Sequence, residues 1–290
     1  KGRVYFCEID GVSNNGVFAT AGSYDIEVAS CEFKNFKGDI QDSSDIAFYN
    51  NANKCKAYNN KCHGGNWHGI RCQLDSVDHK IYNNEVSAHK CYGILAGYEQ
   101  VDKDTSTVVN SNLIYDITGE VLIAGDRRGG AGIYSQSAYG VKVTNNTVRN
   151  CNIQTETEVL IPAAIGVSGN CTVTGNTVEN TAWYGISIFS EDKKSIVSNN
   201  QVTDSLKTAI YIKNSNNVTI NGNEVMFVTA PANRAIFIRN QTGVSTGFTV
   251  SGNEIVNGSE SIAIFNVERF SVTGNVVSSS TGRALNIEGG

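Results

Sequence analysis

Short segments of alternating apolar and polar residues recur along the whole chain, each closed by an asparagine and followed by a further apolar residue. The segment 173–178 (VTGNTV) shows this pattern, and the segment 197–202 (VSNNQV) repeats it. The asparagine returns after 24, 28, 34, 30, 24, 23, 30 and 22 residues, counted by subtracting neighbouring positions. Alternation with a period of two predicts short β-strands. The recurring residues are Asn60, Asn84, Asn112, Asn146, Asn176, Asn200, Asn223, Asn253 and Asn275.

The apolar residue two places after the asparagine is present in every copy. In two earlier copies a cysteine, Cys7 or Cys31, takes the asparagine position. With these copies included, the apolar position is occupied by Ile9, Phe33, Cys62, Val86, Ile114, Val148, Val178, Val202, Val225, Ile255 and Val277. The sequence therefore predicts about eleven repeats.

A second strand-like segment follows in most repeats, and its clearest copy is 184–188 (YGISI). Further copies begin at positions 68, 92, 131, 209, 235, 261 and 284. Hairpins would need two-residue turns such as Asn-Gly between paired strands, and these are too few and wrongly placed. The alternative is a coil in which each strand lies in register on its copy one repeat later. We therefore predict an all-β fold, a right-handed parallel β-helix (solenoid) of about eleven coils.

The asparagine has a physical role in such a coil. Asparagine tolerates the left-handed conformation that a sharp bend requires, and stacked asparagine side chains can hydrogen-bond along the coil axis. At about 4.8 Å per strand, about eleven coils give a rod about 50 Å long. One predicted interior column consists of Ala57, Ile81, Val109, Val143, Val173, Val197, Ile220, Val250 and Val272.

This repeat resembles that of the pectate-lyase-like superfamily of right-handed parallel β-helix proteins. The superfamily includes polysaccharide lyases, alginate epimerases, glycoside hydrolases and bacteriophage tailspikes. The resemblance covers nearly the whole chain and implies a carbohydrate-directed protein. It does not extend to one reaction, because the Asn-Thr-Asp and Gly-His-Gly motifs of polygalacturonases are absent. The Asp-Pro-His motif of alginate epimerases is echoed only by 77–79 (VDH).

Composition and net charge limit the number of domains and the possible partners. One periodicity in 290 residues with two prolines predicts a single domain. The pattern begins near Lys1 and ends near Gly290, so we expect either a fragment of a longer chain or ends covered by partner chains. The net charge of −5 argues against nucleic acid as a partner. The sequence contains no signal peptide and no apolar run long enough to insert into a membrane.

The eight cysteines are interpreted as buried free thiols that act as small apolar residues. Cysteines without a pairing pattern indicate synthesis in a reducing cytoplasm, as for phage proteins. An alternative zinc site lacks a Cys-x-x-Cys pair, so no metal and no cofactor is predicted. Its candidate ligands are Cys55, Cys62, His63, His68 and Cys72.

Three long turns, at 97–107, 118–130 and 152–162, fall on consecutive repeats. Because their coils are consecutive, we expect them to stack into one wall. Long loops on a rigid scaffold are where binding and catalytic groups concentrate. The alternative is that they decorate the rod or contact a neighbouring subunit. The segment 125–130 (GDRRGG), with Arg127 and Arg128, is a candidate for binding an anionic sugar group.

Beside this wall, the position after the second-strand isoleucine is predicted to point outward. It is occupied in successive repeats by Arg71, Leu95, Tyr134, Gly166, Ser187, Tyr211, Phe237 and Ala263. Both tryptophans, Trp67 and Trp183, precede this strand. Aromatic faces pack against sugar rings, so Trp67, Trp183, Tyr134, Tyr211 and Phe237 are predicted substrate-binding residues. Scattered surface aromatics are the alternative.

All four histidines lie between positions 63 and 89. His79 falls on the column of Cys55 and Thr107 and is expected to be an interior residue. Strict alternation points His68 inward, whereas its shared position with Tyr92 suggests the rim of a groove. The neighbouring pair of His89 and Lys90 is assigned to substrate binding.

Two catalytic schemes remain open. For β-elimination of a uronate, Arg71 would neutralise the carboxylate, and His68, Tyr92 or Tyr98 would act as base or acid. Glycoside hydrolysis needs two carboxylates flanking the bond. The loop carboxylates available for it are Glu99, Asp102, Asp104, Glu120, Asp126, Glu156 and Glu158.

The resulting hypothesis is a tailspike-like depolymerase that binds and cleaves a bacterial surface or acidic polysaccharide. The resemblance implies a homotrimer located in a virion tail or outside the cell. The alternative from another class is a non-catalytic β-helix that serves as a glycan-binding or structural shaft.

Overall fold

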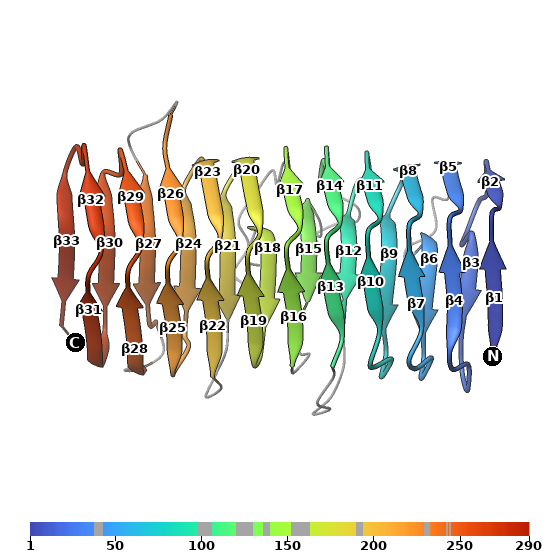
Figure 1. Cartoon of the computed structure of the whole chain (residues 1–290), viewed down its shortest axis with the longest axis horizontal. Helices are drawn as coiled ribbons and strands as arrows, with labels where there is room; N and C mark the ends of the chain where they lie inside the picture. Colours follow the sequence, from blue (N-terminus) through green and yellow to red (C-terminus); the bar gives the residue numbers. More distant parts are fainter. Residues whose placement is uncertain are drawn as a thin grey trace.

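The computed structural model describes residues 1–37, 43–97, 106–119, 130–135, 140–151, 163–189, 194–228, 233–241, 243 and 245–289. In this part of the chain, all strands belong to three parallel sheets of 11 strands each. Each coil contributes one strand to sheets A, B and C in turn, and the coils lie side by side along one axis (Figure 1). The predicted all-β, parallel β-helix of about eleven coils is confirmed.

The strands are short, three to seven residues long. Sheet A contains β1 (Gly2–Tyr5), β4 (Ile26–Ala29), β7 (Lys56–Tyr58), β10 (Lys80–Tyr82), β13 (Val108–Asn110), β16 (Val141–Thr144), β19 (Cys171–Thr174), β22 (Ser195–Ser198), β25 (Val218–Asn221), β28 (Ser245–Ser251) and β31 (Val267–Thr273). Sheet B contains β2 (Glu8–Asp10), β5 (Glu32–Phe36), β8 (Lys61–Gly65), β11 (Glu85–Ser87), β14 (Leu113–Tyr115), β17 (Thr147–Arg149), β20 (Thr177–Thr181), β23 (Gln201–Ser205), β26 (Glu224–Met226), β29 (Glu254–Val256) and β32 (Val276–Ser278). Sheet C contains β3 (Val17–Ala19), β6 (Ser44–Tyr49), β9 (His68–Gln73), β12 (Tyr92–Ala96), β15 (Ala131–Ser135), β18 (Ala163–Ser168), β21 (Tyr184–Phe189), β24 (Thr208–Lys213), β27 (Arg234–Arg239), β30 (Glu260–Phe265) and β33 (Arg283–Glu288).

The expected two-strand repeat is wrong, because each coil has three strands. The segment 173–178 is not one strand: β19 ends at Thr174 and β20 begins at Thr177. Between them Gly175 has a φ of 66°, which turns the chain out of sheet A and into sheet B. A bend between two short strands leaves the apolar alternation intact, so the sequence pattern does not reveal it.

The left-handed residue at this bend is the one before the recurring asparagine. Its φ is 55° at Asn145, 53° at Asn199 and 63° at Gly222. Asparagine and glycine adopt this conformation at low cost. The expectation that the recurring asparagine itself is left-handed is therefore wrong, and its recurrence needs another explanation.

That explanation is a ladder of side-chain hydrogen bonds. We call the nine recurring asparagines, from Asn60 to Asn275, the asparagine ladder. In one rung, the backbone N–H and the Nδ2 of Asn176 both donate to Oδ1 of Asn200, each at 2.9 Å. The Nδ2 of Asn200 then donates to Oδ1 of Asn223 at 2.9 Å. The predicted stacking of these asparagines along the axis is thus confirmed.

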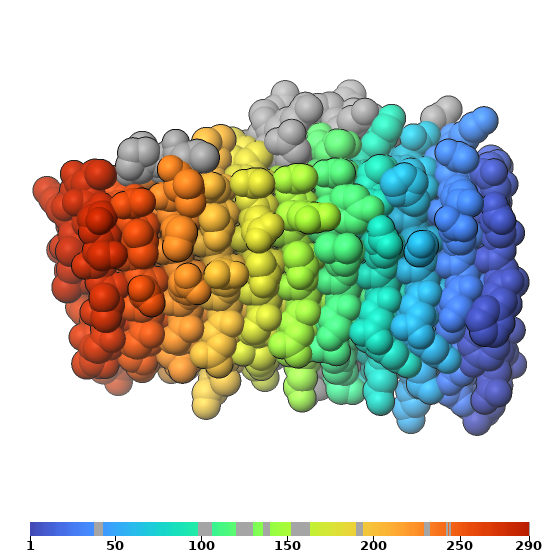
Figure 2. Space-filling view, turned by 45° about the horizontal axis from the view of Figure 1, so that its top comes forward, coloured from blue at the N-terminus to red at the C-terminus, as the bar shows by residue number. Residues whose placement is uncertain are grey.

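The interior of the coil is filled by in-register apolar columns. In the predicted column of sheet A, Val173 pairs with Val143 on one side and with Val197 on the other. Each of these three residues is 0 % exposed. The colour bands in Figure 2 run across the long axis, because each coil contacts only the coils next to it.

A local irregularity in sheet C orients His68. His68 and Ile70 are two positions apart, yet Ile70 lies in the core and His68 stacks on Tyr92 outside it, so strict alternation is interrupted at Gly69. The next strand has the same interruption at Gly93, because the register pairs His68 with Tyr92 and Ile70 with Ile94. A Cβ at Gly69 would lie 2.4 Å from Cγ1 of Val86, which explains the glycine. His68 consequently lies on the outer side, stacked on Tyr92, in the position that it shares with Tyr92.

His79 is an interior residue, as predicted. It is 0 % exposed and stacks on Phe48 with ring centroids 5.2 Å apart. The backbone N–H of Cys55 donates to its Nδ1 at 3.2 Å. Burial disfavours the charged imidazolium and lowers the pKa of His79 to about 4.

This pKa predicts acid sensitivity with a definite sign. The unfolded chain has the ordinary histidine pKa near 6.5, so between pH 6.5 and pH 4 it binds a proton that the folded state does not. The folded protein should lose about 3 kcal/mol of stability across this window as the pH falls. Urea unfolding at pH 7 and pH 4.5 measures this loss. The variant His79→Thr should show a smaller one, because threonine offers an acceptor that does not titrate, as Thr107 does for the N–H of His79. An equal loss in both proteins would contradict the assignment.

His89 also lies in the interior, which corrects its assignment to substrate binding. It is 0 % exposed, and its Nε2 lies 3.0 Å from Oδ2 of Asp45, whose side chain is 1 % exposed. Glycine makes the room for this pair, since a Cβ at Gly65 would lie 2.6 Å from Cδ2 of His89. The pair lies at the corner between sheets B and C, so His89 cannot contact a ligand on the outer surface.

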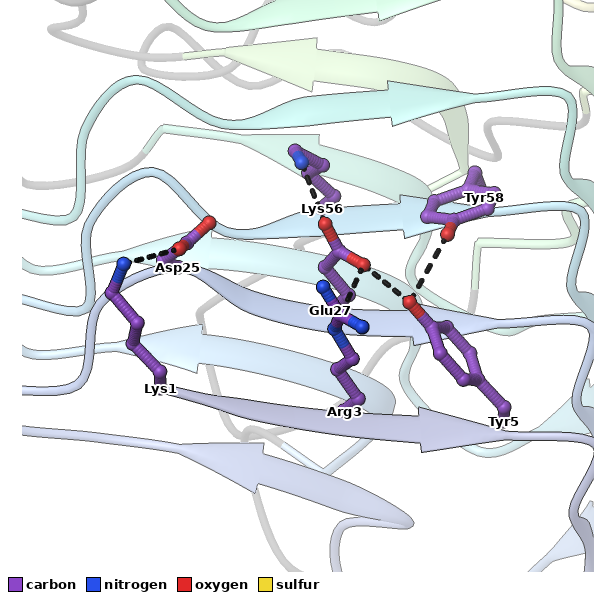
Figure 3. Close-up of polar contacts among 7 residues, drawn as sticks. All are labelled: Lys1, Arg3, Tyr5, Asp25, Glu27, Lys56 and Tyr58. Atoms are coloured by element: carbon purple, nitrogen blue, oxygen red, sulfur yellow. Dashed lines mark hydrogen bonds and ion pairs between the residues drawn. The ribbon is translucent and has the colours of Figure 1, made fainter.

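The outer side of sheet A carries a charged network at its first three strands (Figure 3). The carboxylate of Glu27 on β4 accepts from Lys56 on β7 at 2.6 Å and from the hydroxyl of Tyr5 on β1. Arg3 on β1 adds an ion pair at 3.7 Å. The hydrogen bond from Lys56 contributes most to lowering the pKa of Glu27. Because every group finds its partner within the network, we interpret it as a structural link between coils.

Candidate functional site

The outer face of sheet C has the row of residues that the repeat predicts. Its register aligns Leu95 with Arg71 and with Tyr134, and Tyr211 with Ser187 and with Phe237. Positions far apart in the chain therefore become neighbours along the coil axis. This row divides into two groups of aromatic residues, separated by β18, which has Ala163 and Gly166 at the matching positions.

The first aromatic stack consists of Trp67, His68, Tyr92 and Tyr134. The ring centroids of His68 and Tyr92 are 5.3 Å apart and those of Tyr92 and Tyr134 are 4.8 Å apart, with nearly parallel planes. Trp67 contacts the edge of His68 at 5.9 Å. Only 3 % to 8 % of each of these residues is exposed, so this half of the face is almost fully covered.

Arg71 lies at the same end of the face. Its guanidinium is 5.1 Å from the ring centroid of Tyr49, and its Nη1 donates to Oε1 of Gln73 at 3.4 Å. The residue is 2 % exposed. Its proposed role in neutralising a substrate carboxylate stays a prediction, as do the acid or base roles of His68 and Tyr92.

The second aromatic stack consists of Trp183, Tyr184, Tyr211, Phe237 and Phe265. Tyr184 and Tyr211 stack with centroids 4.5 Å apart, and Tyr211 and Phe237 with centroids 5.3 Å apart. Phe265 contacts Phe237 edge-on at 5.2 Å. Tyr211 and Phe237 are each 6 % exposed.

These stacks correct the way in which aromatic residues were expected to meet a sugar. Parallel strands lie about 4.8 Å apart, which is close to the spacing of stacked rings. Along most of each stack the flat faces of the rings therefore pack against one another. A ligand on this surface would meet ring edges and tyrosine hydroxyls in place of broad aromatic faces.

Four basic residues surround the second aromatic stack. Lys213 and Arg239 follow Tyr211 and Phe237 by two positions and pair with each other in the register of sheet C. Lys213 is partly exposed and Arg239 is exposed. The ammonium of Lys207 lies 3.6 Å from the ring centroid of Trp183. Among the described residues, no ion pair involves Lys213 or Arg239.

Arg234 is the fourth basic residue. Its guanidinium lies 4.2 Å from the ring centroid of Phe237, and its Nε is 2.5 Å from Oε2 of Glu260. Oε1 of Glu260 accepts from Nδ2 of Asn286 at 3.1 Å. We call Lys207, Lys213, Arg234 and Arg239 the basic frame.

The basic frame was not predicted from the sequence, although the repeat places two of its members on neighbouring coils. Extending the row by two positions places Lys213 and Arg239 beside each other on neighbouring coils. The predicted row includes only the position after the isoleucine, whereas Lys213 and Arg239 occupy the next outward position. The four residues stand out because the chain as a whole has a net charge of −5.

The three long turns lie almost entirely outside the described residues. The first leads from β12 in sheet C to β13 in sheet A, whereas the other two lead from sheet B to sheet C, before β15 and β18. The first turn thus follows a strand of sheet C, whereas the other two precede one, and the expected wall of stacked turns lies outside the described residues. The candidates outside the described residues are Tyr98, Glu99, Asp102, Asp104, Glu120, Asp126, Arg127, Arg128, Glu156 and Glu158.

Of the remaining candidates, only His68 belongs to an aromatic stack. Lys90 is partly exposed at the corner that precedes β12. The five residues of the alternative zinc site do not converge: Cys55, Cys62 and Cys72 are interior, whereas His63 on sheet B lies 2.5 Å from Oγ of Ser87 and His68 lies on sheet C. All eight cysteines are free thiols.

Comparison with known families agrees with this architecture. The sequence matches the family described as "right handed beta helix region" over residues 2–159 and 163–290. The chain belongs to the right-handed β-helix family. This membership confirms the predicted hand of the coil and the resemblance of the repeat to β-helix proteins. It leaves the reaction open, because no curated protein sequence matches the chain.

Several solved β-helix structures have a similar fold. The A-module of a mannuronan C-5 epimerase from Azotobacter vinelandii is 11% identical, with a TM-score of 0.64 over 98% of this chain and 80% of that one. The Dettilon tailspike protein is 16% identical, with a TM-score of 0.62 over 98% of this chain and 61% of that one. PfbA, a surface adhesin of Streptococcus pneumoniae, is 13% identical, with a TM-score of 0.61 over 93% and 72%. At these identities the likeness is one of fold.

A helix that crosses a membrane must be long and apolar. Within the described ranges of the chain, no helix has the length and apolarity needed to cross a membrane.

Proposed function

We propose that this β-helix binds an acidic polysaccharide along the outer face of sheet C, through the basic frame that borders the second aromatic stack. The observation that carries the proposal is the in-register pair of Lys213 and Arg239 beside Tyr211 and Phe237. Neighbouring coils are about 4.8 Å apart, so the two cations form a short row along the coil axis. A linear polymer that carries repeated anionic groups complements such a row.

Fold relatives support a carbohydrate ligand. The names of two similar structures describe a mannuronan epimerase and a tailspike, and a third names a surface adhesin. These names fit a location outside the cell or on a virion. Assembly as a homotrimer belongs to the same proposal and is supported only by the fold resemblance. Synthesis in a reducing cytoplasm also belongs to it and is supported only by the free thiols.

A catalytic role would extend the proposal from binding of the polysaccharide to its cleavage. Cleavage would follow lyase chemistry at Arg71, His68 and Tyr92, or glycosidase chemistry at carboxylates of the long turns. The rival is a binding or structural shaft without catalysis. One observation favours the rival: Arg71, His68 and Tyr92 are each at most 5 % exposed, so a substrate would reach them only after their surroundings move.

The binding proposal predicts a charge-dependent interaction. Affinity electrophoresis in gels containing alginate should retard the protein, whereas dextran gels should not. The double variant Lys213→Gln/Arg239→Gln should bind alginate at least about tenfold more weakly, because each lost charge contact at ~4 Å contributes about 1 kcal/mol even in water. Raising the salt concentration should weaken binding of the unchanged protein.

A matched control is available on sheet A. Lys80 and Lys142 are exposed lysines on its outer side, so Lys80→Gln/Lys142→Gln removes the same net charge elsewhere. This control should keep its affinity for alginate. Equal weakening in both double variants would mean that net charge alone governs retention and would refute the proposed face. Incubation of the same mixtures, followed by assays for new reducing ends and for the ultraviolet absorbance of unsaturated uronates, separates hydrolase, lyase and binder.

A further inference from the structure

The first two coils lack the asparagine ladder and carry cysteine in its place. Cys7 and Cys31 both follow a left-handed residue, Phe6 with a φ of 52° and Ser30 with a φ of 55°. The strands after them pair in register, and the backbone N–H of Glu32 donates to the carbonyl oxygen of Cys7 at 2.8 Å. The two cysteines are therefore successive members of one column.

Their thiols have equivalent surroundings. Sγ of Cys7 donates to the carbonyl oxygen of Tyr5 at 3.3 Å, and Sγ of Cys31 donates to that of Ala29, also at 3.3 Å. Sγ of Cys31 also lies 3.7 Å from the carbonyl oxygen of Val4 on the first coil. The side chain of Cys31 thus extends toward the coil that contains Cys7.

No other two cysteines share this relationship. The remaining six are buried, and no two of them are neighbours in one column: Cys55 and Cys171 share a column but lie four coils apart. All eight cysteines lie within the described residues. Cys7 is partly exposed, whereas Cys31 is 2 % exposed. Both line an open hollow of about 410 Å³ together with residues of the first three coils. A small thiol reagent can therefore approach Cys7 from solvent.

The spacing of the column suits a disulfide. Neighbouring parallel strands are about 4.8 Å apart, and disulfides join residues whose Cα atoms are roughly 4.4 to 6.8 Å apart. Both side chains leave the same bend in the same direction. Elsewhere in this column asparagines link successive coils by strong hydrogen bonds, which a pair of reduced thiols cannot replace because S–H is a weak donor.

We propose that Cys7 and Cys31 form a thiol–disulfide redox pair whose oxidised state joins the first two coils covalently. With a disulfide such as oxidised glutathione as oxidant, the thiolate of Cys7 attacks one sulfur and releases one glutathione thiolate. Cys31 then loses its proton to solvent and attacks Sγ of Cys7, which releases the second glutathione. Two protein thiols are oxidised, and one glutathione disulfide is reduced to two thiols.

The order of these steps follows from the different solvent exposure of the two thiols. Burial raises the pKa of Cys31 above its usual value, so little of its thiolate is present at neutral pH. Cys7 is the more accessible thiol and reacts first. The attack by Cys31 is intramolecular, because Cys7 lies next to it in the column.

Peptide mapping tests the proposal on the whole folded chain. Trypsin should release residues 4–34, which contain Cys7 and Cys31 and no other cysteine. After treatment with oxidised glutathione and capping of the remaining thiols, this peptide should be two hydrogens lighter than its reduced form. A second cleavage after glutamate, at Glu8, Glu27 and Glu32, should leave the fragments 4–8 and 28–32 joined until a reductant is added. The oxidised protein should also unfold at a higher urea concentration, and Cys7→Ser should lose that shift.

Two outcomes would overturn the inference. One is a peptide in which both cysteines remain reduced after the treatment. The other is a peptide in which Cys7 stays as a stable mixed disulfide with glutathione. The variant Cys171→Ser changes a buried thiol outside the column, and it should form the Cys7–Cys31 disulfide as readily as the unchanged protein.

Discussion

The variant Val173→Asp should not fold. Val173 is 0 % exposed and lies in the middle of the sheet A column, between Val143 and Val197. A carboxylate at this position would have neither water nor a cation to stabilise it. Its burial costs several kcal/mol, which is comparable to the roughly 5 to 15 kcal/mol that stabilises a typical domain. Circular dichroism and size-exclusion chromatography should show loss of the β signal and of the compact, monodisperse peak.

The neighbouring position supplies the control. Thr172 precedes Val173 on β19 but points to the outer side, where it is partly exposed. Thr172→Asp introduces the same charge on the same strand and should leave the fold intact. A folded Val173→Asp protein would contradict the interior assignment, and an unfolded Thr172→Asp protein would show that β19 tolerates no charge on either side.

The second large effect is expected in the asparagine ladder. Asn200 is 1 % exposed. Its Nδ2 donates to the carbonyl oxygen of Val173 at 3.0 Å and to Oδ1 of Asn223 at 2.9 Å. Asn200→Asp keeps the shape but replaces both donated bonds with contacts between oxygens. The loss should be about 3 to 5 kcal/mol, as for a buried charge without a partner. The midpoint of urea unfolding measures it.

The preceding residue is again a matched control. Asn199 is exposed and has a φ of 53°, a conformation that aspartate also tolerates. Asn199→Asp should change stability by no more than about 0.5 kcal/mol, which is usual for surface substitutions. If both variants lose the same stability, the ladder is not the reason why asparagine recurs at position 200.

The periodic features were predictable from the sequence. Val173 and Val197 fall at the same place in successive repeats, and a single assumption of stacking makes them neighbours. The same assumption places Asn176 next to Asn200. Each prediction depends on residues that recur, so an error in one repeat is corrected by the others.

Features that depend on a single coil were harder to predict from the sequence. His89 occupies the interior because Gly65 leaves space for its ring and Asp45 provides a partner. Neither condition recurs, although the following coils bury Ile117 and Cys151 at the same place. The bend before Asn176 was missed for another reason: it separates two strands without disturbing the alternation between Val173 and Val178.

The sequence predicted the row of residues on the outer face of sheet C but not how little of their side chains is exposed. The row through Tyr211 and Phe237 follows from the repeat alone. Their burial arises at least partly in the stack itself, where each ring packs against its neighbours on both sides. Stacking of the rings on one another follows from the close spacing of strands, which leaves ring edges at the surface more than ring faces.

The asparagine ladder also makes the length of this molecule adjustable. Every rung hydrogen-bonds only to its nearest rungs, so one coil is held in the same way wherever it lies in the stack. A segment running from one rung to the next can be duplicated or removed without leaving an unmatched donor. Growth by copying whole turns would thus extend the rod while its cross-section stays constant.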